Sequence, residues 1–441
     1  MNEKINIKRL VIPLIFEQFL AVSVGMVDTL MVSTVGEVAV SGVALVDNIN
    51  RLIIQVMSAF CSGGGVISSQ YYGSGDLKKT KKTCAQLDSI MIVSSLIFTA
   101  VCLIFSRGIL GLCFRGVEKD VMDSAVIYLT VTSVSYPFLA SYNSGAAVLR
   151  SIGDSKSGMN VSIVMNVINV VFNAIFVFGL HLGVLGVGLA TLLGRIAAAV
   201  IMRIMTCSRK NPLKVEDKKD YLPDPSFIGK ILKIGIPTGI ESGMFQLGKL
   251  MVVGMITDLG TDAIAANSIA FQIIDFPNIP GGAIGLALIT IIGQDIGAGQ
   301  KERAVKDSKK MLKISYLGDW SCKALIFIFA GLIVSAFNLS ASASETAVLV
   351  LHCFCIASVP AWPLSFVLPN AMKGAGDARF TMFIGIISMW LCRVLVSYIL
   401  VKVFHLGVLG VWIGMFADWY LRALCFSLRF HSRKWLERKA I

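Results

Sequence analysis

The chain has 441 residues, of which 55% are hydrophobic and only 15% are charged, and its mean hydropathy is +0.76. This composition excludes a soluble globular protein of that length and is typical of an integral membrane protein. The net charge of +13 does not indicate nucleic-acid binding, because the basic residues gather in turns on one side of the predicted membrane spans. We expect anionic headgroups of membrane lipids, and no nucleic acid, as their partner.

Apolar stretches recur along the chain, and each is long enough to cross about 30 Å of hydrocarbon as a helix of about 20 residues. They predict an all-α integral membrane protein with twelve transmembrane helices. The predicted spans are residues 9–33, 45–70, 85–106, 120–145, 158–180, 184–207, 227–256, 268–294, 310–337, 345–370, 378–402 and 407–430. The first stretch lacks a small-residue cleavage site, so we expect it to remain as a span and not to act as a removable signal peptide.

The charged turns predict the orientation of the chain. Basic residues crowd the amino-terminal segment, the turns near Lys78, Lys210 and Lys301, and the carboxyl-terminal tail, whereas the opposite turns hold about four. Under the positive-inside rule, this asymmetry places both termini in the cytoplasm. We expect a multi-pass protein of the inner (plasma) membrane that functions as a monomer.

The second half of the chain repeats the first at an offset of 223 or 224 residues. "HLGVLGV" occurs at His181 and again at His405, and "IPLIFE" at Ile12 matches "IPTGIE" at Ile236. In addition, "LRSIGDSKSGM" in the first half matches "MKGAGDARFTM" in the second. The matches extend over six predicted spans in each half, so the chain contains a duplicated unit.

Because each copy holds an even number of spans, both copies enter the membrane from the same side. The repeat is therefore parallel, and its pseudo-two-fold axis runs along the membrane normal. We expect an amino-terminal lobe at 1–207, a cytoplasmic linker at 208–226 and a carboxyl-terminal lobe at 227–441. Secondary transporters are built in this way.

The first predicted span contains two acidic residues. Asp28, in "GMVDTLMVSTVG", has no basic residue one helical turn away, and its counterpart in the repeat is Val252. A carboxylate inside the membrane is costly, so we interpret Asp28 as the group that couples transport to H⁺ or Na⁺. The alternatives are a structural hydrogen-bonding acid and an acid close enough to the surface to be solvated. Glu17 lies on roughly the same helix face, nearer the cytoplasm. Glu17 and its counterpart Glu241 are either residues of a substrate cavity or interfacial acids.

The fifth predicted span carries a stripe of amides. Asn166, Asn169 and Asn173 fall at i, i+3 and i+7, which places them on one face of a helix that is otherwise apolar. Such a face packs against other helices, where the amides either form interhelical hydrogen bonds or provide carbonyl ligands in a cavity. Thr191, in the sixth span, offers a further hydroxyl.

The second half places different chemistry at the equivalent positions. Arg393 is the counterpart of Asn169, and Ser397 is the counterpart of Asn173. Basic residues inside the membrane either line a substrate cavity or form ion pairs that lower the cost of their desolvation.

Lys249 and Asp275 also fall inside predicted spans. A pair between Lys249 and Asp275, or between Arg393 and Asp275, is the structural interpretation. Because Pro277 and Pro280 follow Asp275, the sequence predicts an interrupted helix at this point.

Several kinds of site are not indicated by the sequence. No GxxxxGK[ST] motif is present, and none of the four histidines has metal-ligand spacing. We therefore expect no enzyme, no cofactor beyond the coupling ion, and no metal other than Na⁺ at Asp28. Transport would then draw on an ion gradient or on a separate subunit.

Three features of the sequence are similar to the MATE family, the multidrug and toxic compound extrusion transporters. They are "GMVDTLMVSTVG" in the first span, "LRSIGD" and "MKGAGD" before the fifth and eleventh spans, and "GVLGVGLAT" after the fifth. The resemblance covers essentially the whole chain. It implies an antiporter that exports a small organic, usually cationic, compound in exchange for H⁺ or Na⁺.

The resemblance also implies roles for individual residues. Asp28 matches the first-span acid that binds the coupling ion, and Asn169 and Thr191 match ligands of the amino-terminal cation site in some members. Asn173 stands where those members have a second aspartate, so a proton on Asp28 is at least as compatible with this sequence as Na⁺. The alternative function is a lipid or lipid-linked oligosaccharide flippase of related architecture, which would require more arginine in its cavity.

Overall fold

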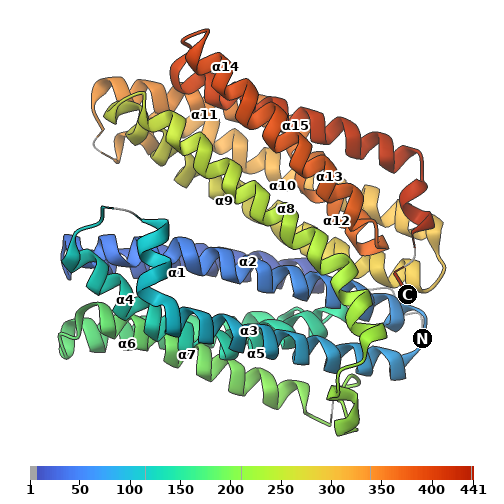
Figure 1. The fold of residues 1–441 in the computed structure, drawn as a ribbon. Helices are drawn as coiled ribbons and strands as arrows, with labels where there is room; N and C mark the ends of the chain where they lie inside the picture. Colours follow the sequence, from blue (N-terminus) through green and yellow to red (C-terminus); the bar gives the residue numbers. More distant parts are fainter. Residues whose placement is uncertain (1–6, 115, 210, 338, 439) are drawn as a thin grey trace. The chain divides into compact units, whose positions relative to one another are not determined.

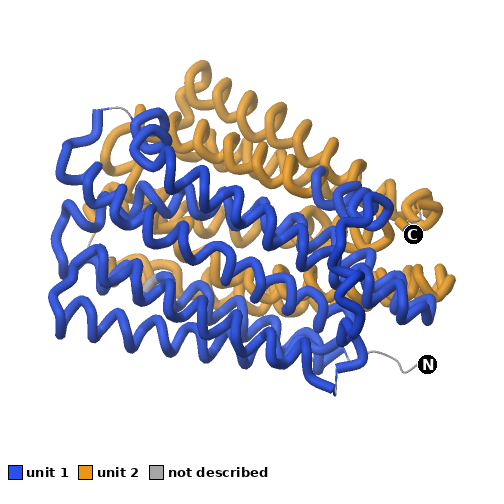
Figure 2. The backbone as a smooth tube through the Cα atoms, turned by 60° about the horizontal axis from the view of Figure 1, so that its bottom comes forward, with its two compact units in different colours: residues 1–236, 441 blue, residues 237–440 orange. Residues whose placement is uncertain are grey.

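The computed structural model describes residues 7–114, 116–209, 211–337, 339–438 and 440–441, and all regular structure in these ranges is helical (Figure 1). The chain divides into two compact units (Figure 2). Unit 1 comprises the residues up to Ile236 together with Ile441, and unit 2 runs from Pro237 to Ala440. The predicted all-α fold class is confirmed.

Unit 1 is built from long helices joined by short turns. They are α1 (Ile7–Ser33), α2 (Glu37–Gly73), α3 (Leu77–Cys113), α4 (Lys119–Val134), α5 (Tyr136–Ser151), α6 (Lys156–Asn173) and α7 (Gly183–Thr206). A π-helix, η1 (Ala174–Gly179), continues α6, and a short 3₁₀ helix, η2 (Lys218–Tyr221), precedes α8 (Pro225–Thr257). The amino-terminal end of α8 belongs to unit 1.

Unit 2 repeats this pattern with more interruptions. Its helices are α9 (Thr261–Gly297), α10 (Lys301–Ser335), α11 (Ala341–Trp362), α12 (Leu368–Ala375), α13 (Ala378–Ser388), α14 (Ser397–Lys402) and α15 (Gly407–His431). The π-helices η3 (Pro363–Val367) and η4 (Met389–Val396) link α11 to α12 and α13 to α14, and the 3₁₀ helix η5 (Lys434–Glu437) follows α15.

Most of the predicted spans meet the length and hydropathy required of a transmembrane helix. Within the described residues, ten helices do so, and α4 with α5, bent by 45°, form an eleventh if the pair is one span. The segment predicted at 227–256 lies in α8 and is not among them. Its charged residues lower its hydropathy; they are Lys230, Lys233, Glu241 and Lys249.

The repeated heptad forms the same turn in both halves. His181 and His405 have left-handed backbones, with φ of 51° and 54°, and Gly183 and Gly407 follow with φ of 56° and 55°. Glycine adopts this conformation without the steric cost of a Cβ atom. The duplication therefore extends to the backbone conformation of the turns into α7 and α15.

The division between the units falls inside α8. In its first turns, the backbone packs against α2 so closely that a Cβ on Gly63 would lie 2.3 Å from the carbonyl oxygen of Ile231. Farther along, Glu241 pairs with Lys373 of unit 2, with 2.8 Å between Oε2 and Nζ. Unit 2 thus begins after Ile236, whereas the sequence placed the start of the second lobe at residue 227.

The interruption predicted after Asp275 is wrong, because α9 runs continuously through Pro277 and Pro280. Each proline removes one backbone N–H group, which would have bonded the carbonyl group four residues earlier. The other hydrogen bonds of this 37-residue helix are enough to continue it.

Candidate functional site

The residues predicted to couple transport to a cation lie together in unit 1. Asn173 Nδ2 donates to Asp28 Oδ1 at 2.7 Å and to Asn169 Oδ1 at 3.3 Å. Asn169 Nδ2 in turn donates to Thr191 Oγ1 at 3.3 Å. This chain of hydrogen bonds joins α1, α6 and α7, and we call its four residues the Asp28 cluster.

Local sequence explains why these side chains meet. Asn169 and Asn173 are one helical turn apart, so they share a face of α6. Gly194 allows α7 to approach that face, because a Cβ at this position would lie 2.9 Å from the carbonyl oxygen of Met165. The close approach sets Thr191, three residues earlier on α7, against Asn169.

The Asp28 cluster contains a buried acceptor. Asn173 is 0% exposed and Asn169 is 6% exposed, whereas Asp28 is half-buried. Asn173 Oδ1 is buried and accepts no hydrogen bond from the described residues. Such an oxygen is costly to bury, and beside a carboxylate it provides a second oxygen ligand. The arrangement suits either a small hard cation or a proton on Asp28.

One asparagine of the predicted stripe is not part of this cluster. Asn166 Nδ2 contacts Ser162 Oγ of the same helix at 3.5 Å. Two of the three amides on the stripe therefore contribute to the cluster, and Asn166 serves as an internal comparison for them.

Sequence reasoning missed two charged residues near the cluster. Asp47 of α2 and Arg195 of α7 both interact electrostatically with Asp28. Arg195 Nη1 also donates to Ser135 Oγ at 2.6 Å. Both residues lie in predicted spans, and a charge inside a span is the signal that could have found them.

Glu17 and Glu241 form equivalent ion pairs in the two halves. Arg150 Nη2 lies 3.9 Å from Glu17 Oε1, and Lys373 Nζ lies 2.8 Å from Glu241 Oε2. Arg150 and Lys373 occupy the same place in the repeated "LRSIGD" and "MKGAGD". The Tyr142 hydroxyl donates to Glu17 at 3.2 Å. These glutamates therefore tie helices together within each unit.

A second group of charges is buried in unit 2. Arg422 Nε donates to Asp418 Oδ1 at 2.7 Å, and Arg393 Nε lies 4.0 Å from Asp418 Oδ2. Both guanidinium groups lie 5.2 Å from the centroid of the Phe245 ring. A carboxylate beside Arg393 is thus Asp418 of α15, which the sequence did not indicate.

Lys249 and Asp275 are both exposed in unit 2. Lys249 Nζ lies 5.3 Å from the centroid of the same Phe245 ring. Phe245 is thus surrounded by cations on α8, η4 and α15.

Another buried ion pair lies entirely on α10. Lys323 Nζ contacts Asp319 Oδ2 at 2.6 Å and lies 5.0 Å from the centroid of the Phe354 ring. The i, i+4 spacing makes the pair local, and pairing lowers the cost of burying both charges. Sequence reasoning missed this pair, although both residues fall in the span predicted at 310–337.

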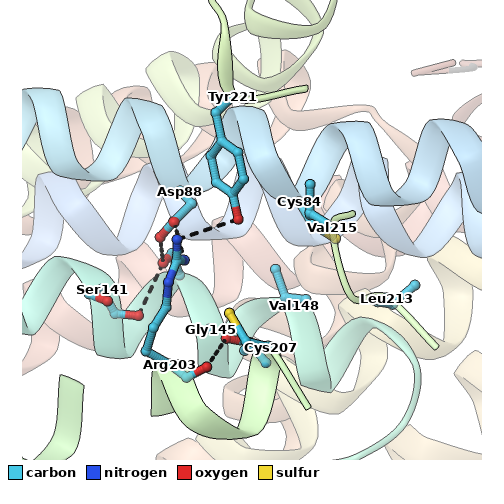
Figure 3. Close-up of a pocket in the computed structure, with 12 residues that line it drawn as sticks. Cys84, Asp88, Ser141, Gly145, Val148, Arg203, Cys207, Leu213, Val215 and Tyr221 are labelled. Carbon is cyan, nitrogen blue, oxygen red and sulfur yellow. Dashed lines mark hydrogen bonds and ion pairs between the residues drawn. The ribbon is translucent and has the colours of Figure 1, made fainter. Parts of the chain in front are cut away.

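Unit 1 also contains a small, partly open cavity of about 30 Å³, lined by both polar and apolar side chains (Figure 3). Arg203 Nη1 pairs with Asp88 Oδ2 at 2.6 Å, and Arg203 Nη2 donates to the Tyr221 hydroxyl at 3.4 Å. Ser144 Oγ donates to Asp88 Oδ1 at 2.7 Å. A volume of this size holds one or two water molecules and no organic compound.

The cavity lies where the segment between α7 and α8 binds to α3. Gln86 Nε2 donates to the carbonyl oxygens of Asp220 and Leu222 at 2.6 and 2.7 Å, and Gln86 Oε1 accepts from the backbone N–H of Asp224 at 2.9 Å. Ser89 Oγ donates to the carbonyl oxygen of Tyr221 at 3.0 Å. Residues 220–224 of the predicted linker are therefore fixed to unit 1 by side chains.

Known proteins resemble this chain in sequence and in fold. A family model described as MatE matches residues 13–175 and again residues 237–399. The two matches are 224 residues apart, as 237 − 13 = 224, which is the offset of the sequence repeat. The uncharacterized transporter YisQ of Bacillus subtilis is 28% identical over 430 residues, covering 97% of this chain and 94% of that protein.

Two further relatives carry names that refer to drug resistance. The probable multidrug resistance protein NorM of Thermotoga maritima is 28% identical, with 98% of this chain and 93% of that protein covered. The multidrug resistance protein MdtK of Proteus mirabilis is 23% identical, with 100% and 97% covered.

Solved structures share the fold over nearly the whole chain. A crystal structure of MATE in the straight conformation has a TM-score of 0.90 at 19% identity and covers 97% of this chain and 96% of that one. MATE in the bent conformation has a TM-score of 0.89 at 19% identity, with 97% and 95% covered. Since the family model also matches well over half of the sequence, this chain belongs to the MATE family of membrane transporters.

Proposed function

We propose that this protein is a secondary active antiporter that exports organic, mainly lipophilic cationic, compounds in exchange for H⁺ or Na⁺. The family membership and the names of the multidrug resistance relatives support export of small organic compounds. The proposal includes alternating access, a plasma-membrane location with both termini in the cytoplasm, and function as a monomer surrounded by lipid.

The observation that carries the proposal is the hydrogen bond between Asp28 and the buried amide of Asn173. A cation bound by Asp28, or a proton on it, changes the hydrogen bonds that the carboxylate accepts. Because the Asp28 cluster joins three helices, that change alters the packing of α1 against α6 and α7. Ion binding is then coupled to export if ion and compound favour different arrangements of these helices.

The composition of the cluster favours H⁺ over Na⁺. Asp28 is its one carboxylate, while the other members contribute amides and a hydroxyl. The negative charge of Asp47 and the positive charge of Arg195 both act on Asp28 and oppose one another, so they add no clear net attraction for a further cation. Exchange of a proton requires only the single carboxylate.

The test is transport of a panel of lipophilic cationic dyes by purified protein in lipid vesicles, with Na⁺ and pH gradients imposed separately. We expect a pH gradient to drive dye against its concentration gradient when Na⁺ is equal on both sides. A Na⁺ gradient at equal pH should drive transport more weakly. Dye movement that responds to neither gradient would contradict antiport.

A further inference from the structure

Unit 2 contains a group of charges whose positive members outnumber the negative one. Arg393 and Arg422 are each 4% exposed, and the carboxylate that both approach, Asp418, is 0% exposed. Together with Phe245 and Lys249, we call these residues the Phe245 cluster. Two buried guanidinium groups against one carboxylate leave a net charge of +1 in the buried part of the cluster.

The hydrogen bonds show which of the two guanidinium groups carries the excess positive charge. Arg422 is well bonded, because Nε donates to Asp418 Oδ1 at 2.7 Å and to Ser388 Oγ at 2.8 Å, and Nη2 donates to the carbonyl oxygen of Gly385 at 3.0 Å. Arg393 is not. Its Nε is 4.0 Å from Asp418, and its buried Nη1 has no hydrogen-bond partner among the described residues.

A second donor in the same region has no acceptor either. Trp419 Nε1 is buried and donates to none of the described residues. The Trp419 ring lies 5.9 Å from Phe366, whose ring lies 6.4 Å from Phe245. A buried cation that shares its one counter-ion with a second cation is costly, as is a buried donor without an acceptor. The group that would satisfy Arg393 is therefore a negatively charged acceptor.

The Phe245 cluster extends to the surface of unit 2. Phe245 is half-buried and Lys249 is exposed, and Lys249 Nζ lies 5.3 Å from the centroid of the Phe245 ring. Exposed Lys249 and buried Arg393 thus both lie against the ring of Phe245. Arg393 lies in the π-helix η4, a kind of segment that is frequent at functional sites.

The charges of this cluster differ from those around Asp28. In unit 1, Asp28 interacts with the carboxylate of Asp47 and with the guanidinium group of Arg195, and Asp47 interacts with the guanidinium group of Arg51 as well. In unit 2, two guanidinium groups share the single carboxylate of Asp418. The duplicated fold therefore carries different sets of charges in its two copies.

We propose that the Phe245 cluster binds the carboxylate group of an aromatic organic compound. The guanidinium group of Arg393 accepts a carboxylate in a bidentate arrangement, Lys249 attracts it at the surface, and Phe245 stacks on the aromatic part. This inference adds a class of bound compound to the proposed function. It rests on the proposed function only for the statement that the bound compound is exported.

Binding of two matched dyes to purified, detergent-solubilised protein tests this inference. Rhodamine B carries a free carboxylate, whereas its ethyl ester lacks that charge on the same aromatic scaffold. We expect fluorescence anisotropy to give a dissociation constant about 10-fold lower for rhodamine B than for the ester, as one charged hydrogen-bonded pair provides. Equal affinities would overturn the site.

Variants of Arg393 test whether this residue binds the carboxylate. Arg393→Gln should remove the preference for rhodamine B and leave binding of the ester unchanged, and Arg393→Lys, which keeps the charge, should retain part of the preference. Arg379→Gln, which alters an exposed arginine of α13, is the matched control and should behave as wild type. An Arg393→Gln protein that keeps the preference, or that loses both dyes equally, would contradict the inference.

Dye binding separates this inference from the antiport proposal. A protein that prefers rhodamine B through Arg393 but shows no ion-driven transport supports the site and contradicts antiport. Ion-driven export with no preference between the dyes supports antiport and contradicts the site.

Discussion

Asn173 is the centre of the Asp28 cluster, because its amide nitrogen donates to both Asp28 and Asn169. Its own oxygen is buried and accepts nothing from the described residues. The position thus combines a donor that orients the carboxylate with an oxygen that is available to an ion. A second carboxylate at position 173 would increase the negative charge that the site offers to a cation.

Asn173→Asp should therefore strengthen Na⁺ dependence. The substitution adds a negative charge beside Asp28, and two carboxylates bind a hard cation more strongly than one. We expect the Na⁺ concentration for half-maximal transport to fall by about 10-fold, the effect of about 1.4 kcal/mol. Dye transport into vesicles at varied Na⁺ measures it.

Asn166→Asp is the control for this change, because Asn166 lies about two turns before Asn173 on α6 and contacts Ser162 of the same helix. If both variants shift the Na⁺ dependence equally, the effect comes from an added negative charge anywhere on this helix and not from the position of residue 173. The assignment of Asn173 to the ion site would then be wrong.

Asp224 offers a pH-dependent contact outside the membrane spans. A hydrogen bond from Lys82, with 2.5 Å between Nζ and Oδ2, holds the pKa of the Asp224 carboxyl below its usual value of 3.8. The stability contributed by ionised Asp224 is therefore fully present above 3.8 and is lost as the pH falls through the lower folded pKa.

Thermal unfolding of wild type and Lys82→Met, between about pH 3 and 6, checks this contact. Wild type should unfold at a higher temperature than Lys82→Met at the upper end of this range, and the difference should shrink as the pH falls. A difference that is constant across the range would show that the ion pair does not stabilise the fold.

The approach of α7 to α6 depends on one residue without a side chain. Gly194→Ala would place a Cβ 2.9 Å from the carbonyl oxygen of Met165. Backbone cannot yield as a flexible side chain does, so we expect a destabilisation of about 1–3 kcal/mol together with weaker transport. Thermal unfolding and dye transport measure the two effects.

Gly108→Ala is the matched control, because a Cβ at Gly108 in α3 would meet nothing within 4 Å. Replacing a helical glycine by alanine without a clash is neutral or stabilising. Unchanged stability in Gly194→Ala would mean that the helices do not require this close approach to form the Asp28 cluster.

The segment before α8 depends on one side chain of α3. Gln86→Ala removes three hydrogen bonds to the backbone of residues 220–224, each worth about 1 kcal/mol. We expect faster cleavage of this segment by added protease and a lower unfolding temperature. Gln272→Ala, at an exposed position of α9, should change neither. Equal cleavage of wild type and Gln86→Ala would contradict this account.

The duplicated sequence predicted much of the molecule. Hydropathy and the offset of 224 residues were sufficient for the all-α fold, since the spacing of apolar residues is a local property. The Asp28 cluster also followed from local patterns, because Asn169 and Asn173 share a helix face. The resemblance to a known family supplied their connection to Asp28 and Thr191.

The remaining contacts could not be predicted, because they join residues distant in sequence. Arg393 lies beside Asp418 only because η4 packs on α15, and no spacing rule relates residues 25 positions apart, as 418 − 393 = 25. The start of unit 2 inside α8 likewise depends on which helices the two ends of α8 contact. Repetition of the fold did not extend to these charges, which differ between the copies.

The most direct test of the antiport mechanism is dye transport by Asp28→Asn in vesicles with an imposed pH gradient. Asparagine keeps the shape of the side chain but cannot exchange a proton, so we predict that gradient-driven transport falls to the level of protein-free vesicles while dye binding persists. Asn166→Ala, outside the cluster, should transport as wild type does. Transport by Asp28→Asn at the wild-type rate, with unchanged dependence on pH and Na⁺, would contradict the role of Asp28 in coupling.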